Sequence, residues 1–191
     1  MKRSLLFLIP LLVVVLLVLW LQPEQQVEEP APVPIKVELL PREALLYFAD
    51  PAGRYLVSEI QQIAGCDEDR DCVRNLFIAL VKGSQGDLLP ILPPQTKVLN
   101  VELRDDLVVV DFNGVFVHAH PGGSLSELLT VYGLVNSLAV NFPYLKQVQI
   151  LVEGQPVETL KGHVSLARPV MADFSYSRPP QADVRKDVPN E

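Results

Sequence analysis

Two histidines one residue apart are the clearest candidates for chemistry in this chain. His118 and His120 lie in the stretch FVHAHPGGSLSELL, residues 116–129. On a strand, residues i and i+2 project from the same face, so both imidazoles could bind one metal ion. Catalytic zinc needs three protein ligands, so His163 and a carboxylate such as Asp111 would have to join them. We predict instead that the pair is polar surface at a strand end, with no metal, cofactor or catalytic residue, and keep the metal site as the alternative.

Two other residues have the right chemical type for catalysis but are better explained structurally. Ser124 is not in a Gly-x-Ser-x-Gly turn, and its spacing to Glu127 is that of a helix capping box. We therefore predict Ser124 as a helix cap. Asp111, inside the apolar run VVVDFNG, could be a buried general acid. We favour the interpretation that its carboxylate accepts a hydrogen bond from neighbouring backbone at a strand end.

The chain has two cysteines, Cys66 and Cys72. In one helix they would lie about 9 Å apart along the axis, beyond the roughly 7 Å between Cα atoms that a disulfide can join. We predict a disulfide with Cys66 in the loop before a helix and Cys72 in its first turn, contributing about 2 kcal/mol. Two free thiols, or a redox pair, which the spacing disfavours, are the alternatives.

Strand and helix patterns alternate along the chain. Alternating or continuous apolar residues predict the strands, whereas apolar residues at helical spacing, such as Val73, Leu76 and Leu80, predict the helices. The predicted strands are 44–49, 54–63, 96–103, 107–117 and 148–154, and the helices are 67–83 and a second one from Ser124 to Asn141-Phe142-Pro143. This order predicts an α+β fold, a small two-layer sandwich with two helices on one face of a mixed or antiparallel sheet.

The amino-terminal segment predicts a membrane anchor. Residues 5–21 are apolar, with Pro10 as the one interruption, and follow Lys2 and Arg3. This run reaches the short end of the length that spans hydrocarbon, and no small residues of a signal-peptidase site follow it, so we favour an uncleaved anchor over a cleaved signal. Positive charge before the run predicts that the rest lies outside the cytoplasm.

The predicted organisation has five parts. They are a cytoplasmic end (1–4), a transmembrane signal anchor (5–21), a Pro/Glu-rich linker (22–42), a folded domain (43–174) and a disordered tail (175–191). The formal net charge of −7 and the lack of a basic patch with interleaved aromatic residues argue against a nucleic-acid partner.

Three stretches of the domain together resemble a known family. Residues 44–63, 92–113 and 130–170 are similar to the GerMN domain, named for a bacterial sporulation and germination protein; the similarity spans Glu43–Val170. LVNSL, VQILVEG and ETLKGH carry it most strongly, which marks as family-motif positions Asn136, Gly154, Thr159, Gly162 and His163. We interpret His163 as a turn histidine whose ring bonds backbone.

The resemblance implies what the residues alone do not. Members of the family are bacterial envelope proteins without known catalytic residues, and their fold resembles ring-building modules. Together with the predicted anchor, this implies a single-pass protein of the cytoplasmic membrane whose domain lies outside the cytoplasm. We expect that domain to bind an envelope protein or a second copy through a sheet edge or helix flank. No small-molecule substrate is evident. Sporulation members carry two such domains and a lipid anchor, so their role is not carried over. The alternative is a metal-dependent envelope enzyme using His118 and His120.

Overall fold

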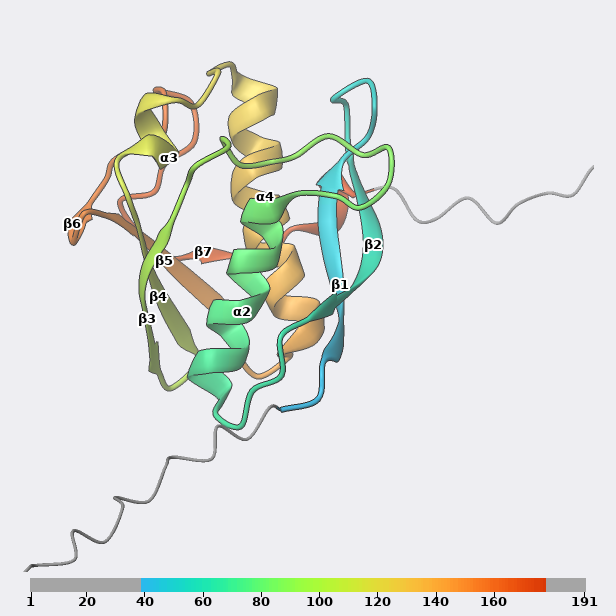
Figure 1. Cartoon of the computed structure of the whole chain (residues 1–191). Helices are drawn as coiled ribbons and strands as arrows, with labels where there is room; N and C mark the ends of the chain where they lie inside the picture. Colours follow the sequence, from blue (N-terminus) through green and yellow to red (C-terminus); the bar gives the residue numbers. More distant parts are fainter. Residues whose placement is uncertain (1–38, 178–191) are drawn as a thin grey trace, which may run out of the picture. The chain divides into compact units, whose positions relative to one another are not determined.

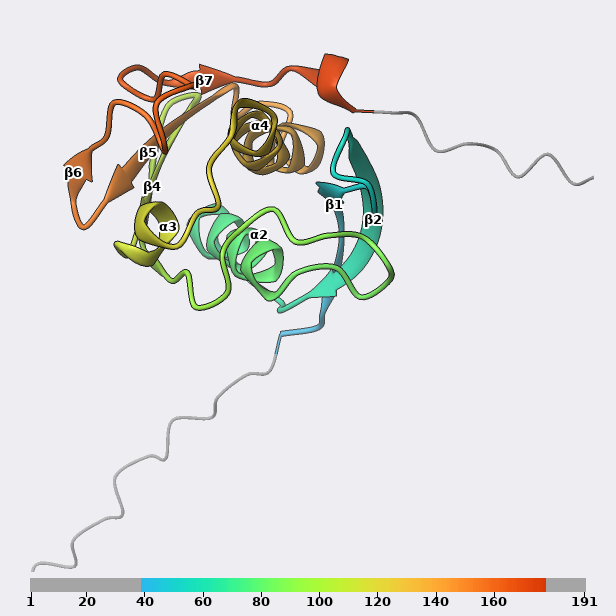
Figure 2. The same cartoon turned by 90° about the horizontal axis from the view of Figure 1, so that it is seen from above.

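The computed structural model describes residues 39–177, in which two sheets enclose two helices (Figures 1 and 2). The predicted α+β class is confirmed. The anchor predicted at 5–21, most of the linker and residues 178–191 of the tail lie outside the described residues. Within residues 39–177, none of the helices is both long enough and apolar enough to cross a membrane.

The first sheet is a hairpin of β1 (Arg42–Ala49) and β2 (Leu56–Ile63), which pair antiparallel over eight residues without a bulge. Alternate β1 side chains, Ala44, Leu46 and Phe48, are buried, because period-2 alternation turns one face of the hairpin to the core. The buried Asp50 carboxylate accepts hydrogen bonds from the turn backbone at Arg54 and Tyr55 and so closes the hairpin.

The second sheet is built on three longer strands, β3 (Val98–Arg104), β4 (Leu107–Phe112) and β5 (Gln147–Val152). β3 and β4 are antiparallel, whereas β4 and β5 are parallel. The two-residue strands β6 (Gln155–Pro156) and β7 (Val170–Met171) pair with the other side of β5. β4 is nearly all apolar and lies between β3 and β5, as its composition predicts.

Helices α2 (Asp69–Lys82) and α4 (Ser124–Asn141) lie between the two sheets, as the view from above shows (Figure 2). α2 has acidic residues in its first turn and ends at Gly83, whose φ of 88° favours glycine. α4 is buried on most of its circumference and ends before Pro143, as predicted. A helix covered from two sides needs such all-round apolar character.

The arrangement differs from the prediction in one respect, because the strands form two sheets rather than one. Among the strands of residues 39–177, β1 and β2 pair with each other and with no other strand; Ala49 and Leu56 make isolated bridges to Leu89 and Ser177. The other edge of β1 faces α4, and helix side chains satisfy its backbone: Asn141 bonds both the N–H and the C=O of Leu45, and the Ser137 hydroxyl accepts from Tyr47. No strand can therefore join the hairpin to the second sheet along this edge.

The strand predicted over 107–117 is shorter than expected. β4 ends at Phe112, and residues 115–118 form the short helix α3 (Val115–His118). Asn113 turns the chain, because its side chain accepts a hydrogen bond from the backbone of Lys97 and donates one to Gln95. α3 then packs Phe116 onto Phe112, with the ring centroids 4.7 Å apart.

The predicted capping box at Ser124 is also wrong. Gly123 is the N-cap of α4, no side chain caps the helix start, and Ser124 is the first helical residue. Glu127 turns into the protein instead of back toward the helix start, so it has no part in capping.

The carboxy-terminal end of the domain extends past its predicted limit at residue 174. Phe174–Tyr176 form the short 3₁₀ helix η1, and Ser177 makes a parallel bridge to Leu56 at the start of β2.

Candidate functional site

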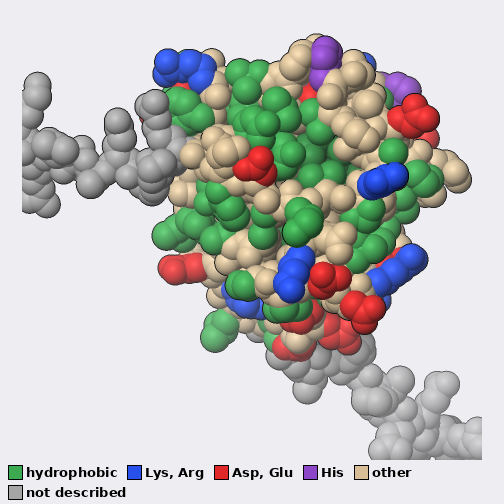
Figure 3. Space-filling model, turned by 180° about the vertical axis from the view of Figure 1, so that it is seen from behind, with side chains coloured by type: hydrophobic (Ala, Val, Ile, Leu, Met, Phe, Trp, Pro, Cys, Tyr) green, Lys and Arg blue, Asp and Glu red, His purple; other side chains and the backbone are tan. Residues whose placement is uncertain are grey.

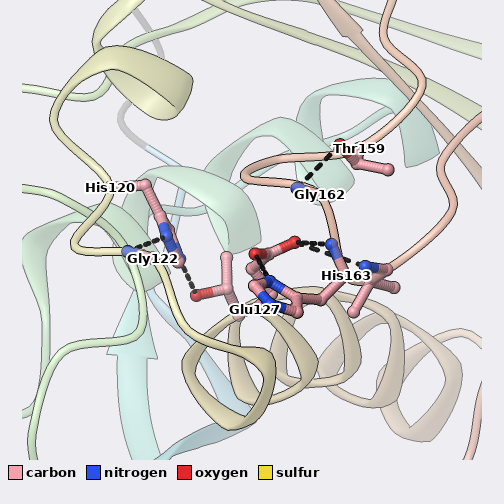
Figure 4. A network of polar contacts seen from close by, with 8 residues as sticks. His120, Gly122, Glu127, Thr159, Gly162 and His163 are labelled. Atoms are coloured by element: carbon pink, nitrogen blue, oxygen red, sulfur yellow. Dashed lines mark hydrogen bonds and ion pairs between the residues drawn. The ribbon is translucent and has the colours of Figure 1, made fainter.

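The two histidines do not form the predicted pair on one strand face. Because residues 115–118 are helical, His118 ends α3 and is exposed, whereas His120 follows the helix and is only 4% exposed. Figure 4 shows the His120 ring directed inward, toward the first turns of α4. The geometric premise of the metal hypothesis, two imidazoles on one face, is therefore wrong.

Both ring nitrogens of His120 are already used. Nδ1 accepts a hydrogen bond of 3.0 Å from the backbone N–H of Gly122, so Nε2 carries the proton. Nε2 donates to the Thr130 hydroxyl at 3.0 Å, and that hydroxyl donates to the carbonyl of Ile91. Burial lowers the pKa of His120, which favours this neutral ring. Among residues 39–177, no three His, Cys, Asp or Glu side chains converge in a way that could hold a metal ion.

A buried carboxylate lies one helical turn before Thr130, and the sequence interpretation missed it as a site residue. Glu127 is fully buried. Its Oε1 accepts a 2.7 Å hydrogen bond from His163 Nδ1, and its Oε2 accepts from the backbone N–H groups of His163 and Val164 (Figure 4). Burial alone would raise the pKa of Glu127, but the hydrogen bonds from His163 and the adjoining backbone outweigh it and lower the pKa to about 2.

The contacts of Glu127 hold the ETLKGH segment, residues 158–163, in place. The Thr159 hydroxyl accepts from the Gly162 backbone, and Gly162 has a φ of 106°, so the segment closes as a tight turn. His163 lies in this turn as predicted, but its ring bonds a carboxylate rather than backbone. The sequence signal for this contact is an acid on the buried face of α4, in line with Val131 and Leu134, where an unpaired charge would be costly.

Asn136 holds the carboxy-terminal segment in the same manner. It is fully buried, and its amide donates to the carbonyl of Asp173 at 2.8 Å and accepts from the N–H of Asp173 at 3.0 Å. Tyr132 stacks on Tyr176 one turn earlier, with the centroids 4.7 Å apart. One helix therefore fixes both the ETLKGH turn and the end of the domain.

Asp111 bonds neighbouring backbone, as the sequence interpretation favours. Its Oδ1 accepts a 2.9 Å hydrogen bond from the N–H of Gly154, which has a φ of 78° in the turn between β5 and β6. The family-motif glycine is therefore paired with the strand-end aspartate.

Cys66 and Cys72 form a disulfide whose ends match the predicted placement. Cys66 lies in the loop before α2 and Cys72 in its first turn, with their Cα atoms 5.2 Å apart. The Arg42 guanidinium, at the start of β1, approaches the Cys72 sulfur at 3.0 Å.

An apolar pocket of about 350 Å³ lies next to His120. Its walls come from the proline-rich connector, from the chain around His120 and from α4, and comprise Ala49, Gly53, residues 89–94, residues 119–121, Ser126, Leu129 and Thr130. No Asp, Glu, Lys or Arg lines it, and the two nitrogens of its histidine are bonded. The pocket can receive an apolar group, and its lining offers no free acid or base that could activate the Ser126 hydroxyl.

Comparisons with known proteins agree with the resemblance to the GerMN domain. The profile of the Germane family, described as sporulation and spore germination, matches residues 45–158. This stretch contains both helices and the motif residues Asn136 and Gly154. No curated protein matches the chain.

Three solved structures are similar. A Clostridium perfringens protein described as a candidate lipoprotein is 26% identical, with a TM-score of 0.51 over 69% of this chain and 87% of that chain. The first GerMN domain of the Bacillus subtilis sporulation protein GerM is 19% identical, with a TM-score of 0.52 over 69% of this chain and 96% of that one. The tandem GerMN domains of GerM are also 19% identical, with a TM-score of 0.52 over 70% of this chain, which spans 46% of the pair.

Proposed function

We infer that this chain, which belongs to the Germane (GerMN) family of sporulation and spore-germination domains, works as a non-catalytic interaction module of the bacterial envelope. Residues 5–21 anchor it in the cytoplasmic membrane in a single pass, the Pro/Glu-rich linker gives it reach, and the domain faces the extracytoplasmic side. There it binds an envelope protein or a second copy of itself. The sporulation role of other family members is not part of the proposal.

The observation that carries the proposal is that the polar side chains of the candidate site hold the fold together. His120 is bonded at both nitrogens, Glu127 fixes the ETLKGH turn, and Asn136 fixes the carboxy-terminal segment. Catalysis needs a group that is free to exchange a proton, attack a substrate or bind a metal. Groups that are committed to internal hydrogen bonds serve rigidity instead, which suits a domain that works through its surface.

Exposed apolar side chains support a surface role. Leu125 of α4 is 42% exposed and Phe174 of η1 is 46% exposed. Leu128 and Tyr132, which follow Leu125 at helical spacing, are half-buried. Seen from the side of β7 and η1, hydrophobic side chains gather on the upper half of the molecule, whereas most charged side chains lie on the lower half (Figure 3). Such surfaces mark contact sites more often than isolated apolar residues do.

Two further observations support the envelope location. The disulfide between Cys66 and Cys72 is of a kind that persists in oxidising compartments. The Clostridium perfringens neighbour is described as a candidate lipoprotein. Tethering to a membrane also raises the local concentration of the domain, so weak surface contacts are enough for assembly.

Cross-linking of the full-length protein in its own membrane tests the proposal. A lysine-reactive reagent can reach the exposed Lys82, Lys97 and Lys161, which lie on different parts of the domain. We expect adducts that mass analysis assigns either to multiples of this chain or to another envelope protein. Complete modification of these lysines without any protein adduct would contradict the proposal.

A further inference from the structure

Three long strands lie at sheet edges, and two of these edges are protected. The edge of β1 is covered by the α4 side chains described above, and at Ala49 by two backbone hydrogen bonds with Leu89. The edge of β3 has a register shift between Val98 and Asn100, and Arg74 of α2 donates to the carbonyl of Leu99. Bulges and covering groups of this kind keep an edge from pairing with another chain.

The outer edge of β2 lacks such protection. On β1, the backbone N–H and C=O groups of Leu45, Tyr47 and Ala49 point away from β2. In an antiparallel pair, the residues opposite them on β2 therefore point their own N–H and C=O groups away from β1, toward the outer edge of the hairpin. One of these partners, Leu56, meets Ser177. At the other outward positions of this edge, Ser58, Ile60 and Gln62, the backbone N–H and C=O have no hydrogen-bond partner within residues 39–177.

The outward positions of this edge also lack the side chains that discourage pairing. The charged residue of β2, Glu59, lies between two outward positions, and its carboxylate accepts hydrogen bonds from Ser84 and Gln85. β2 reads LVSEIQQI, without proline, lysine or arginine, and it pairs with β1 without a bulge. Ile60, at the middle of the open stretch, is 65% exposed. A regular edge whose three outward residues are neutral, with an exposed β-branched residue at its centre, is a template for another strand.

We propose that this edge pairs antiparallel with β2 of a second copy of this chain, with Ile60 facing Ile60 across a two-fold axis. In this register Ser58 lies opposite Gln62 of the second copy, and the three outward positions form about six main-chain hydrogen bonds, two at each position. The two hairpins become one continuous four-stranded sheet. The proposal rests on the proposed function and names the surface and the partner for its self-association.

Self-pairing fits this edge because the register is self-complementary. Two chains that each carry a formal net charge of −7 repel, but the facing side chains Ser58, Ile60 and Gln62 are all neutral. Serine meets glutamine, each with donors and acceptors, and isoleucine meets isoleucine, which removes the most exposed apolar side chain of the hairpin from water.

The chain's own carboxy-terminal tail fits the outer edge of β2 less well than a second copy does. Ser177, the last described residue, bridges Leu56 at the start of β2. Residues 179 and 180 are both proline, and proline has no N–H to donate to a strand partner.

A single cysteine at the two-fold axis tests the pairing in the full-length protein in its own membrane. At a hydrogen-bonded antiparallel position the facing Cα atoms lie about 5.5 Å apart, within the range of about 4.4–6.8 Å that a disulfide joins. We expect Ile60→Cys to give a disulfide-linked dimer in most chains under mild oxidation. Met171→Cys is the matched control, because Met171 is 61% exposed but lies on β7, and its dimer yield should be at least ten-fold lower.

Mixed cysteine variants test the register. Chains with Ser58→Cys should link to co-expressed chains with Gln62→Cys, whereas Ser58→Cys alone should not, because the two copies of residue 58 lie about 13 Å apart along the strands. Adding Ile60→Lys, which puts two positive charges face to face, should lower the mixed adduct at least ten-fold, and Met171→Lys should not. If Ile60→Lys lowers the thermal midpoint, Ile60→Pro serves instead, because it removes an outward N–H that is unpaired in the single copy.

The failures of the two proposals are distinguishable. If Ile60→Cys gives no dimer while lysine cross-linking still yields protein adducts, the β2 pairing is overturned and the proposed function stands. A disulfide from Ile60→Cys to a different protein likewise overturns self-pairing. If the thiol of the Ile60→Cys variant is protected from a water-soluble maleimide, and deletion of residues 178–191 removes the protection, the occupant is the tail and self-pairing is overturned. Absence of adducts in both experiments overturns both proposals.

Discussion

Replacing Glu127 by glutamine perturbs the contact that joins α4 to the ETLKGH turn. The variant keeps the shape of the side chain but removes its charge and directs an NH₂ group toward backbone donors. Lowering the pKa of Glu127 from the ordinary 4.5 to about 2 corresponds to about 3 kcal/mol in favour of the ionised, folded state. Solvent contact of the His163 ring, whose side chain is 46% exposed, reduces this to about 2 kcal/mol.

The sign of the pH dependence follows from the direction of this pKa shift. Because the folded pKa of Glu127 lies below the unfolded one, its stabilisation is fully present above about pH 4.5 and is lost as the pH falls toward 2. The difference in unfolding free energy between wild type and Glu127→Gln should therefore be about 2 kcal/mol at pH 7 and less than half of that at pH 3.

Urea unfolding followed by circular dichroism on the purified full-length chain measures this difference. Glu158→Gln is the matched control, because Glu158 is exposed, lies at the start of the same turn, and contributes only its backbone carbonyl to a hydrogen bond. It should change the unfolding free energy by less than about 0.5 kcal/mol. Equal stability of Glu127→Gln and wild type at pH 7, or a difference that persists unchanged at pH 3, would refute the reasoning.

The other buried contacts lead to three further predictions. Asn136→Ala should lower the unfolding free energy by about 2 kcal/mol and speed amide hydrogen exchange in the carboxy-terminal segment, because it removes three hydrogen bonds between a buried side chain and that segment; unchanged exchange there would contradict this role. Replacing Cys66 and Cys72 together by serine should cost about 2 kcal/mol and increase exchange in the first turn of α2, whereas equal loss throughout the domain would show that the disulfide is not a local staple. Replacing His118 and His120 together by alanine should leave the metal content of the purified protein, measured by mass spectrometry, unchanged; loss of a stoichiometric metal would revive the metal hypothesis.

Local sequence patterns were enough to locate the helices and strands but not to predict which strands share a sheet. The apolar spacing of Val73, Leu76 and Leu80 locates α2, and Pro143 locates the end of α4, because both signals act within a few residues. The division into two sheets depends on Asn141 and Ser137, which bond the edge of β1 more than 85 residues away in the chain. Nothing in their own neighbourhood distinguishes these residues from ordinary polar positions on a helix.

The candidate site shows the same limit. Ser124 and Glu127 have capping-box spacing, yet Glu127 bonds a turn 36 residues later, and a long-range contact of this kind outweighs a local capping preference. The strand prediction around His118 failed for a local reason, since Asn113-Gly114 is a turn signal inside an otherwise apolar run. The placement of the disulfide was accessible from sequence, because helix geometry leaves one arrangement in which the two cysteines can bond; that they bond rather than stay free was not fixed by geometry.

The most direct test of the central claim, that the domain works by binding protein through its surface, is site-specific photo-cross-linking in growing cells. A photoreactive residue is placed in turn at Ile60 of β2, Leu125 of α4 and Tyr144, which are 65%, 42% and 50% exposed. The account predicts discrete protein adducts, strongest from Ile60 and equal in mass to two copies of this chain. Full photolysis without an adduct from any of the three positions would contradict it.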